Sequence, residues 1–327
     1  MLRPFFTVRL RLVGSLVASV IVIVATTSTA AELNRIRVTG TSAIAENVWP
    51  LFIAQEKGFF TNETLEVQLT FTRESIKALI AGSVQIVNEG ADDGLTVMQK
   101  GQNVIAVGAI QVRPGEFLVT LPDIKAIDQL RGKQFAVSAV PSTDMRLAAD
   151  LLESRGLMRG DVVFRKIGFT GARLAALQSK QVAATLLSPA GWLEGNKKTQ
   201  FNTLATPVDF GIFPWVVMQT QGDWARKNKK LVVAYIRAVN RAIQWLYDLA
   251  NLPEAKRLIA PKAQLAEKDV EDLLRVVQQD KIYFTGKLTP DILKRAVDFL
   301  VEEGSLKAPV DLNQFLDTSF WNEAFAR

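Results

Sequence analysis

The sequence predicts an α/β protein with two lobes, each a mostly parallel sheet flanked by helices, and a ligand cleft between the lobes. Three observations support this fold class. Stretches typical of strands alternate with stretches typical of helices from residue 35 to residue 187. One segment recurs in similar form 98 residues further along the chain. The chain has 327 residues, which is enough for two domains. Alternating strands and helices favour parallel sheets covered on both faces.

The first part of the chain justifies this alternation element by element. Predicted strands are short runs in which apolar residues alternate or form one block, and predicted helices begin at capping residues or end at a glycine. The strands are expected at residues 35–40, 65–71, 84–90, 103–112, 116–122, 130–140, 162–169 and 182–187. The helices are expected at residues 49–60, 74–82, 142–157 and 170–180, with a further one beginning at Asp92 and Asp93.

The repeated segment suggests two similar units. Residues 71–84 (FTRESIKALIAGSV) and 169–182 (FTGARLAALQSKQV) are identical at five of 14 positions. Gly58 and Gly156 stand at the same offset, each at the end of the helix that follows a unit's first strand. We interpret the pair as two βαβ units, although any two such units also resemble each other because each packs a short helix on a sheet. Ligands bind beyond the carboxyl ends of such strands, so two facing units form a cleft suited to hinge closure.

After Trp215 the sequence is mostly helical. Apolar stripes at helical spacing predict helices that face the core. Thr289 and Pro290 are typical of a helix N-cap followed by proline at the first helical position. The stripes are Leu231, Tyr235, Ala238, Ala242 and Leu246; Val270, Leu273, Leu274 and Val277; and Ile292, Leu293, Ala296, Val297 and Leu300.

Composition excludes several kinds of chemistry. The chain has no Cys and no His. It therefore has no disulfide, no thiolate nucleophile, no Ser-His-Asp triad and no His-ligated zinc. Carboxylate catalysis and hard-metal sites remain open in principle. We expect a binding protein rather than an enzyme, with no cofactor and no metal.

The N-terminus is typical of a secretory signal peptide spanning residues 1–31. Three Arg precede a 14-residue apolar run, and small residues follow it. An uncleaved membrane anchor is the alternative, but the run is short for a span. Removing this segment lowers the net charge from +6 to +3, with no block of Lys or Arg, which gives no reason to expect nucleic-acid binding. Without Cys no lipid anchor is possible there, so we expect a free periplasmic protein.

Residues 49–69, WPLFIAQEKGFFTNETLEVQL, carry a family resemblance. The chain resembles substrate-binding proteins of the nitrate/sulfonate/taurine type, which serve ABC importers, over roughly residues 35–260. ALIAGSVQI, DIKAIDQLRGKQFAVS, LAALQSKQVAA and AYIRAVNRAIQWLYDLANLPEAKRLIA continue the likeness. One branch of the superfamily makes or binds a thiamine pyrimidine precursor and has His before the first apolar helix. Val48 stands at that place here, so the enzyme of that branch that consumes its own His is not expected.

The resemblance implies a type II periplasmic binding protein fold, with two lobes joined by two crossing strands. The first lobe is expected to comprise residues 32–121 and 215–327, and the second residues 122–214. It also implies a small-molecule solute in the cleft and delivery to an ABC permease in the inner membrane by a monomer. The alternatives left open are a ligand sensor that docks on a membrane signalling protein, and an enzyme of the pyrimidine-precursor or carboxylate-based type.

The candidate ligand-binding residues lie in loops at strand ends. Ser138, Ser142 and Thr143 flank a helix N-terminus, which would offer an anion cradle. Arg113 could pair with a carboxylate or sulfonate in two-pronged fashion, or be solvated. The other candidates are Ser42, Asn47, Trp49, Thr72, Arg73, Gly90, Asp92, Thr170, Ser188, Phe213 and Trp215.

Each candidate also has a purely structural interpretation. Thr72, Thr170, Ser142 and Thr143 are residues that cap helices. Trp49 suits a packed core, and Asp92 suits the first turn of a helix. Acidic and basic candidates are mixed, so the residues leave the charge of the solute open. The family favours an organic anion such as a sulfonate or carboxylate.

Overall fold

The computed structural model describes Met1 and residues 33–40, 42, 45–72, 74–198 and 200–326. Residues 33–327 form one compact unit. The predicted signal peptide lies outside the described residues apart from Met1, and Arg73 lies outside them as well. No helix of the described part is both long and apolar enough to cross a membrane.

The first sheet has the strand order β2-β1-β3-β10-β4. β1 pairs in parallel with β2 and β3, and β10 runs antiparallel to both β3 and β4. Four of its five strands therefore share one direction. The strands are β1 Asn34–Gly40, β2 Leu65–Phe71, β3 Ile86–Glu89, β4 Val104–Gln111 and β10 Val216–Gln221.

The second sheet repeats this plan with the order β7-β6-β8-β5-β9. β6 pairs in parallel with β7 and β8, and β5 is the strand of opposite direction. The fold class predicted from the sequence is thus confirmed: there are two lobes, each with a mixed but mostly parallel sheet. The strands are β5 Phe117–Thr120, β6 Gln134–Val137, β7 Val163–Lys166, β8 Ala184–Leu187 and β9 Asn202–Ala205.

The repeated segments occupy equivalent places in the two sheets. β3 and β8 begin exactly one offset apart, at Ile86 and Ala184, and each is the third strand of its order. The helices before them, α3 (Ser75–Ile80) and α6 (Thr170–Gln178), carry the repeated Ala-Leu. Gly58 and Gly156 both adopt positive φ, +68° and +86°, which lets the chain leave a helix without a Cβ clash.

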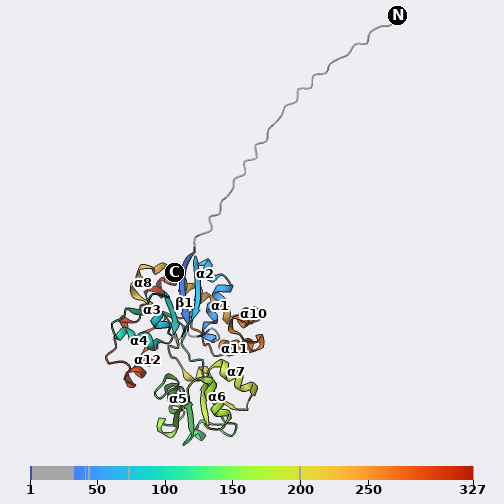
Figure 1. Cartoon of the computed structure of the whole chain (residues 1–327), viewed down its shortest axis with the longest axis vertical. Coiled ribbons are helices and arrows are strands. Elements are labelled where there is room, and N and C mark those ends of the chain that lie inside the picture. Colours follow the sequence, from blue (N-terminus) through green and yellow to red (C-terminus); the bar gives the residue numbers. More distant parts are fainter. Residues whose placement is uncertain (2–32, 41, 43–44, 73, 199, 327) are drawn as a thin grey trace. The chain divides into compact units, whose positions relative to one another are not determined.

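Helices flank both sheets (Figure 1). In the first lobe α1 and α2 pack against the long helix α9, and α4 packs against β4 and α12. In the second lobe α6 packs against β8 and α7. The helices are α1 Trp49–Glu56, α2 Phe59–Asn62, α3 Ser75–Ile80, α4 Ala91–Gln99, α5 Thr143–Ser154, α6 Thr170–Gln178, α7 Pro189–Lys198, α8 Gly222–Lys227, α9 Lys229–Tyr247, α10 Leu252–Ala263, α11 Glu267–Gln279, α12 Pro290–Glu302 and α13 Ser319–Ala324.

The predicted C-terminal stripes are buried, except that Leu231 and Ile292 are half-buried. The α9 stripe faces the core, where Tyr235 stacks on Phe60 with ring centroids 5.8 Å apart. The Tyr235 hydroxyl accepts a hydrogen bond of 2.9 Å from Asn88 Nδ2, which ties α9 to β3. Thr289 caps α12 by accepting a hydrogen bond from the Ile292 N–H. One element was not expected: β10 follows Trp215 and lies between β3 and β4.

Two connections join the lobes, one from β4 to β5 and one from β9 to β10. They touch each other, because the Phe213 N–H donates to the Val112 carbonyl at 2.9 Å. β5 belongs to the second sheet, which places the first connection at residues 112–116. The lobe boundaries expected from the sequence put residues 116–121 in the first lobe and stay a prediction; the pairing of β5 argues for an earlier boundary.

Candidate functional site

A cavity of about 230 Å³ lies between the end of β3 in the first lobe and the start of α5 in the second. Its walls come from the β3–α4 turn and the loop before α1 in the first lobe, from the start of α5 in the second, and from the returning connection. The lining residues are Asn47, Glu89, Gly90, Asp92, Thr143, Phe213, Trp215 and Val216. Six of these eight were candidates from the sequence; Glu89 and Val216 were not.

The turn from β3 to α4 brings two carboxyl groups to the cavity. β3 is buried along its whole length, and Gly90 follows it as the N-cap of α4. Gln219 on β10 donates a hydrogen bond of 2.8 Å to the Gly90 carbonyl and fixes the turn. Glu89 and Asp92 are therefore held by the sheet and the first helical turn.

A direct hydrogen bond connects the two lobes at the cavity. The Thr143 hydroxyl, at the start of α5, donates to Asp92 Oδ2 at a distance of 3.1 Å. Asp92 lies in the first turn of α4. The first turns of two helices from different lobes therefore meet here, which is the geometry expected of a closing cleft.

Burial raises the pKa of both carboxyl groups. The pKa of Glu89 rises to about 7, mainly through burial, with a contribution from the negative charges of Asp93 and Asp92. The pKa of Asp92 rises to about 6, again mainly through burial, against the lowering effect of the Thr143 hydrogen bond. Glu89 Oε1 and Asp92 Oδ1 are buried without a hydrogen-bond partner, as is Asn47 Oδ1.

The expected anion cradle in the second lobe is filled by the chain's own carboxylate. Asp144 accepts hydrogen bonds from the Ser138 N–H at 2.8 Å, from the Ser138 hydroxyl at 2.7 Å and from the Ser142 hydroxyl. Arg173 Nη1 lies 3.2 Å from Asp144 Oδ2, and both side chains are buried. Ser142 also caps α5 by accepting from the Met145 N–H. These serines therefore hold an internal carboxylate.

Aromatic rings close one side of the cavity. Phe213 and Trp215 lie on the connection between β9 and β10, with ring centroids 6.2 Å apart and the rings edge to face. Phe213 is 2% exposed, and the Arg295 guanidinium lies 5.7 Å from its ring centroid. Trp215 is only partly buried. The connection that carries both rings also joins the second lobe to the first, so it helps to determine how the two lobes are arranged.

A second group of acids is buried near the first connection. Burial raises the pKa of Glu116 to about 8, against the lowering charge of Arg173 and with the raising charges of Asp144 and Glu46. Burial likewise raises the pKa of Glu46 to about 7. Glu46 packs so tightly on Gly115 that a Cβ there would lie 2.5 Å from its Oε1. The region between the lobes is therefore rich in carboxyl groups.

Several candidates lie away from the lining of this cavity. Trp49 is fully buried in the core of the first lobe, with its Nε1 unpartnered. Thr72 accepts a hydrogen bond from the Glu74 N–H and acts at the start of α3. Arg113 is half-buried near Tyr247, whose pKa is raised by burial while the charge of Arg113 opposes that rise.

Three further candidates are also placed outside the lining. Thr170 lies at the start of α6, where its hydroxyl accepts a hydrogen bond of 3.4 Å from Arg173. Ser188 Oγ accepts from the Gly191 N–H at 3.4 Å in the first turn of α7. Ser42 is half-buried in the loop after β1. The hydroxyls of Thr72 and Ser188 thus have local partners at the starts of α3 and α7.

The sequence carried a signal for the missed residue Glu89. It stands directly between a buried strand and the glycine that begins the next helix, in VNEG. Strand-end acids at such a turn reach the edge where ligands bind. Val216 gave no comparable signal, because it belongs to β10, which the sequence did not suggest.

A larger hollow, of about 560 Å³, lies elsewhere on the first lobe. It is lined by residues of the α4–β4 turn, of α8 and of the segment before α13, including Asn103, Arg226 and Gln314. Asn103 precedes β4 and so lies at the amino end of that strand. Because ligands of such folds bind at carboxyl ends, the smaller cavity is the better candidate.

A protein-family model described as "NMT1/THI5 like" matches residues 45–251. The putative binding protein YtlA of Bacillus subtilis (strain 168) is 23% identical over 206 residues, or 60% of this chain and 62% of YtlA. The matched segment thus spans less than two thirds of the length of the first curated relatives.

Solved structures show the same fold. The periplasmic aliphatic sulphonate-binding protein SsuA of Escherichia coli matches with a TM-score of 0.74 at 15% identity, over 89% of this chain and 99% of that one. The resemblance to sulfonate-type binding proteins is thereby confirmed. The desulfurization enzyme DSZB also matches, with a TM-score of 0.63 at 17% identity over 89% and 99%. This fold therefore serves both binding proteins and at least one enzyme.

Proposed function

This chain belongs to the NMT1/THI5-like family, and we propose that it is the solute-binding subunit of an ABC-type importer. It captures a small solute in the cavity between its lobes and presents the closed complex to a membrane permease. The observation that carries this proposal is the cavity itself: it lies between the end of β3 in the first lobe and the start of α5 in the second, and polar oxygens in its walls are buried without partners. A bound solute would satisfy these oxygens.

Binding rather than turnover is the function that these residues support. Without Cys or His, the chain has carboxyl groups as its main candidates for proton transfer. In the lining, Asp92 is already bonded to Thr143. The Ser75 hydroxyl lies within hydrogen-bonding reach of Glu89, but it donates to the Thr72 carbonyl at 2.7 Å. The sequence-based expectation that the protein is not an enzyme is therefore part of the proposal.

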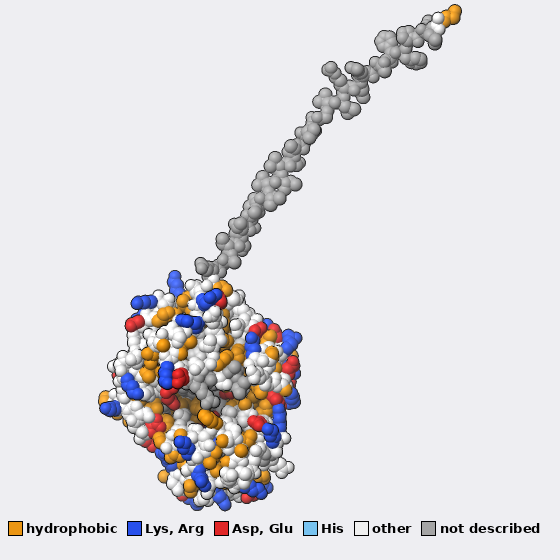
Figure 2. Space-filling model, in the orientation of Figure 1, with side chains coloured by type: hydrophobic (Ala, Val, Ile, Leu, Met, Phe, Trp, Pro, Cys, Tyr) orange, Lys and Arg blue, Asp and Glu red, His pale blue; other side chains and the backbone are white. Residues whose placement is uncertain are grey.

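Location and assembly complete the proposal. We expect residues 1–31 to direct export and to be removed, which would leave a free monomer in the periplasm. Lys and Arg are interspersed with Asp and Glu over the visible face of the molecule, with no broad patch of one sign (Figure 2). This distribution gives no reason to expect nucleic-acid binding.

The experiment is expression of the full chain in a double-membrane bacterium, followed by purification from the periplasmic fraction. Mass spectrometry should find a chain that begins near Glu32. A thermal-shift screen should then find one class of small solute that raises the melting temperature, because a ligand that binds only the folded state stabilises it.

Two outcomes would contradict the proposal. Recovery of an unprocessed chain in the membrane fraction would contradict export as a free protein. The second outcome has two parts: the Thr143→Val variant binds the solute as tightly as the wild type, and the protein converts the solute to product. Together these results would contradict simple capture by the lobes. Ser154→Ala, a change at the far end of the same helix, is the matched control and should leave binding unchanged.

A further inference from the structure

We propose that the cavity takes an organic cation with N–H donors, such as a primary ammonium or an amidinium, rather than an organic anion. The inference rests on the proposed function only in that the cavity is taken as the solute site. It changes the class of solute that the family resemblance favours.

The first ground is a set of three unpaired acceptors in one cavity. Asn47 Oδ1, Glu89 Oε1 and Asp92 Oδ1 are each buried without a hydrogen-bond partner, and all three residues line the cavity. Buried acceptors left unpaired cost free energy, so a native site usually satisfies them with a ligand or water. An ammonium group has three donors and no acceptor, and an amidinium likewise offers only donors.

The second ground is the sign of the charges around the cavity. Among the described residues, the lining contains two acids and no Lys or Arg. The charged groups that act on Glu89 and Asp92 are acids as well, namely Asp93 and Glu303. An anion placed here would meet repulsion from every one of these carboxylates, whereas a cation would be attracted.

The third ground is that the chain's own carboxylates occupy the places where an anion would bind. The first turn of α4, with its free N–H groups and positive dipole end, already carries Asp92 and Asp93. The Ser138 and Ser142 donors at the start of α5 already hold Asp144.

Two guanidinium groups close to the connections between the lobes are engaged too. Arg173 pairs with Asp144 at 3.2 Å. Arg295 pairs with Asp150 at 2.7 Å and donates to the Phe210 carbonyl. Among the described residues of the cleft, neither guanidinium is left for an anionic solute.

The fourth ground is the aromatic wall and the size of the space. Phe213 and the partly buried Trp215 line the cavity, and aromatic rings attract cations through their quadrupoles. At roughly 30 Å³ for each water-sized group, a cavity of about 230 Å³ admits roughly eight non-hydrogen atoms. Benzylamine and benzamidine are probes of this size.

The test uses the full-length processed protein and matched probes in isothermal titration calorimetry. The cationic probes are benzylamine and benzamidine, the anionic probes are benzoate and benzenesulfonate, and Ca²⁺ and Mg²⁺ are tested separately. Any small molecule released on denaturation is identified by mass spectrometry before the titrations.

The expected result is binding of a cationic probe that strengthens at least about 10-fold from pH 5.5 to pH 8. The sign follows from the lining: a cation favours ionised carboxylates, and the pKa values of Asp92 and Glu89, about 6 and about 7, lie inside this window. Glu89→Gln should weaken binding about 10-fold and flatten the pH profile. Asp93→Asn, a change of an exposed acid on the same turn, should weaken it less than about 3-fold.

Other results would overturn the inference while sparing the importer. Binding of an anionic probe, or of a divalent metal ion, in preference to the cations would do so. So would a released molecule that carries a carboxylate or sulfonate and no amine. If no probe binds and no small molecule is released, both the inference and the proposed function fail.

Discussion

The carboxyl group of Glu116 is buried between the lobes, and it shares its nearest buried cation with another acid. Arg173 is the nearest buried cation, and Asp144 already neutralises it at 3.2 Å. Glu116 Oε2 has no hydrogen-bond partner. A charged carboxylate in this place costs free energy, so the folded protein favours the protonated acid and its pKa rises to about 8.

The first prediction at this scale concerns the pH dependence of stability. Between the unfolded pKa of about 4.3 and the folded pKa of about 8, the folded state binds more protons, so the free energy of unfolding falls as pH rises. Glu116→Gln removes the ionisation. We expect the variant to exceed the wild type by about 1–3 kcal/mol at pH 8 and to match it near pH 4.5, measured by urea unfolding.

The matched control is Glu153→Gln, a change of an exposed acid on α5. It should shift the free energy of unfolding by less than about 0.5 kcal/mol at either pH. Equal behaviour of the two variants at pH 8 would show that Glu116 ionises in the folded state as freely as a surface acid.

At the residue scale, the sequence predicted which residues lie near the cavity better than it predicted their hydrogen-bond partners. Asn47, Gly90, Asp92, Thr143, Phe213 and Trp215 are the candidates that line the cavity. Ser138 and Ser142 were expected to hold a ligand, but Asp144 takes their hydroxyls. A sequence shows which side chains can donate, whereas the acceptor that reaches them first depends on helix geometry and on the buried Arg173.

At the scale of elements, α4 approaches β10 more closely than a side chain would allow. A Cβ on Gly94 would lie 1.7 Å from Gln219 Oε1 and 3.0 Å from the Phe315 ring. Gln219 is also the residue that holds the Gly90 carbonyl at the cavity. The packing of α4 on the sheet and the position of the β3–α4 turn at the cavity therefore both depend on Gly94.

Gly94→Ala should consequently harm both stability and binding. The added methyl group must displace Gln219 or lift the helix, and overpacking of this kind costs about 1–3 kcal/mol. Solute affinity should fall as well, because the Gly90 turn loses its support. Chemical unfolding and titration calorimetry measure the two effects.

Gly171→Ala is the matched helical control for this change. Nothing lies within 4 Å of a Cβ on Gly171 in α6, so helix propensity alone acts there and should stabilise by about 0.5–1 kcal/mol. If both alanines stabilise the protein, the tight contact at Gly94 does not constrain α4.

Elements with a local signal were predictable, and those fixed by distant pairing were not. β2 spans the predicted residues 65–71 without change, and α5 and α6 fall within their expected ranges. β10 was missed because its place between β3 and β4 is decided by strands that precede it by more than a hundred residues. β5 likewise pairs with β8 and β9, two strands that follow it by more than 60 residues.

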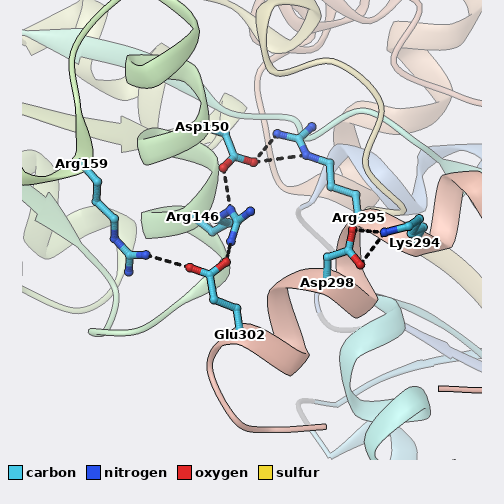
Figure 3. A network of polar contacts seen from close by, with 7 residues as sticks. All are labelled: Arg146, Asp150, Arg159, Lys294, Arg295, Asp298 and Glu302. Atoms are coloured by element: carbon cyan, nitrogen blue, oxygen red, sulfur yellow. Dashed lines mark hydrogen bonds and ion pairs between the residues drawn. The ribbon is translucent and has the colours of Figure 1, made fainter. Parts of the chain in front are cut away.

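At the scale of the whole molecule, a network of ion pairs connects α5 of the second lobe to α12, which packs on α4 of the first (Figure 3). Asp150 accepts from Arg146 at 2.6 Å and from Arg295 at 2.7 Å. Glu302 pairs with Arg146 and, at 3.3 Å, with Arg159. Arg295 also donates to the Phe210 carbonyl of the returning connection at 2.7 Å. The network therefore joins both lobes and the segment between them.

The two-lobed fold was predictable because each repeated unit shows its own strand and helix pattern in a short stretch of sequence. The ion-pair network was not predictable. Its members come from three segments that no sequence spacing relates, and each is an ordinary surface charge when taken alone. Only the packing of α12 beside α5 makes Asp150 a shared acceptor for two guanidinium groups. The relation between the lobes thus depends on contacts that the repeat does not encode.

Asp150→Asn should loosen the lobes more than it unfolds them. The amide keeps the shape but loses the charge that holds Arg146 and Arg295, each about a quarter exposed. We expect a loss of about 1–2 kcal/mol in the free energy of unfolding. We also expect a larger radius of gyration for the ligand-free protein in small-angle X-ray scattering, because Arg295 no longer ties α12 to the second lobe. Both differences should shrink in high salt.

Asp298→Asn provides the comparison within the same picture, since Lys294 and Asp298 form an exposed i,i+4 pair on α12 alone (Figure 3). Such a pair contributes about 0.3–0.5 kcal/mol and spans no lobe boundary, so the scattering curve should not change. The decisive quantity is the difference between the two variants. An unchanged radius of gyration for Asp150→Asn would mean that the two connections alone fix the arrangement of the lobes. The contact between Phe213 and Val112 would then be sufficient, and the ion pairs would contribute nothing to that arrangement.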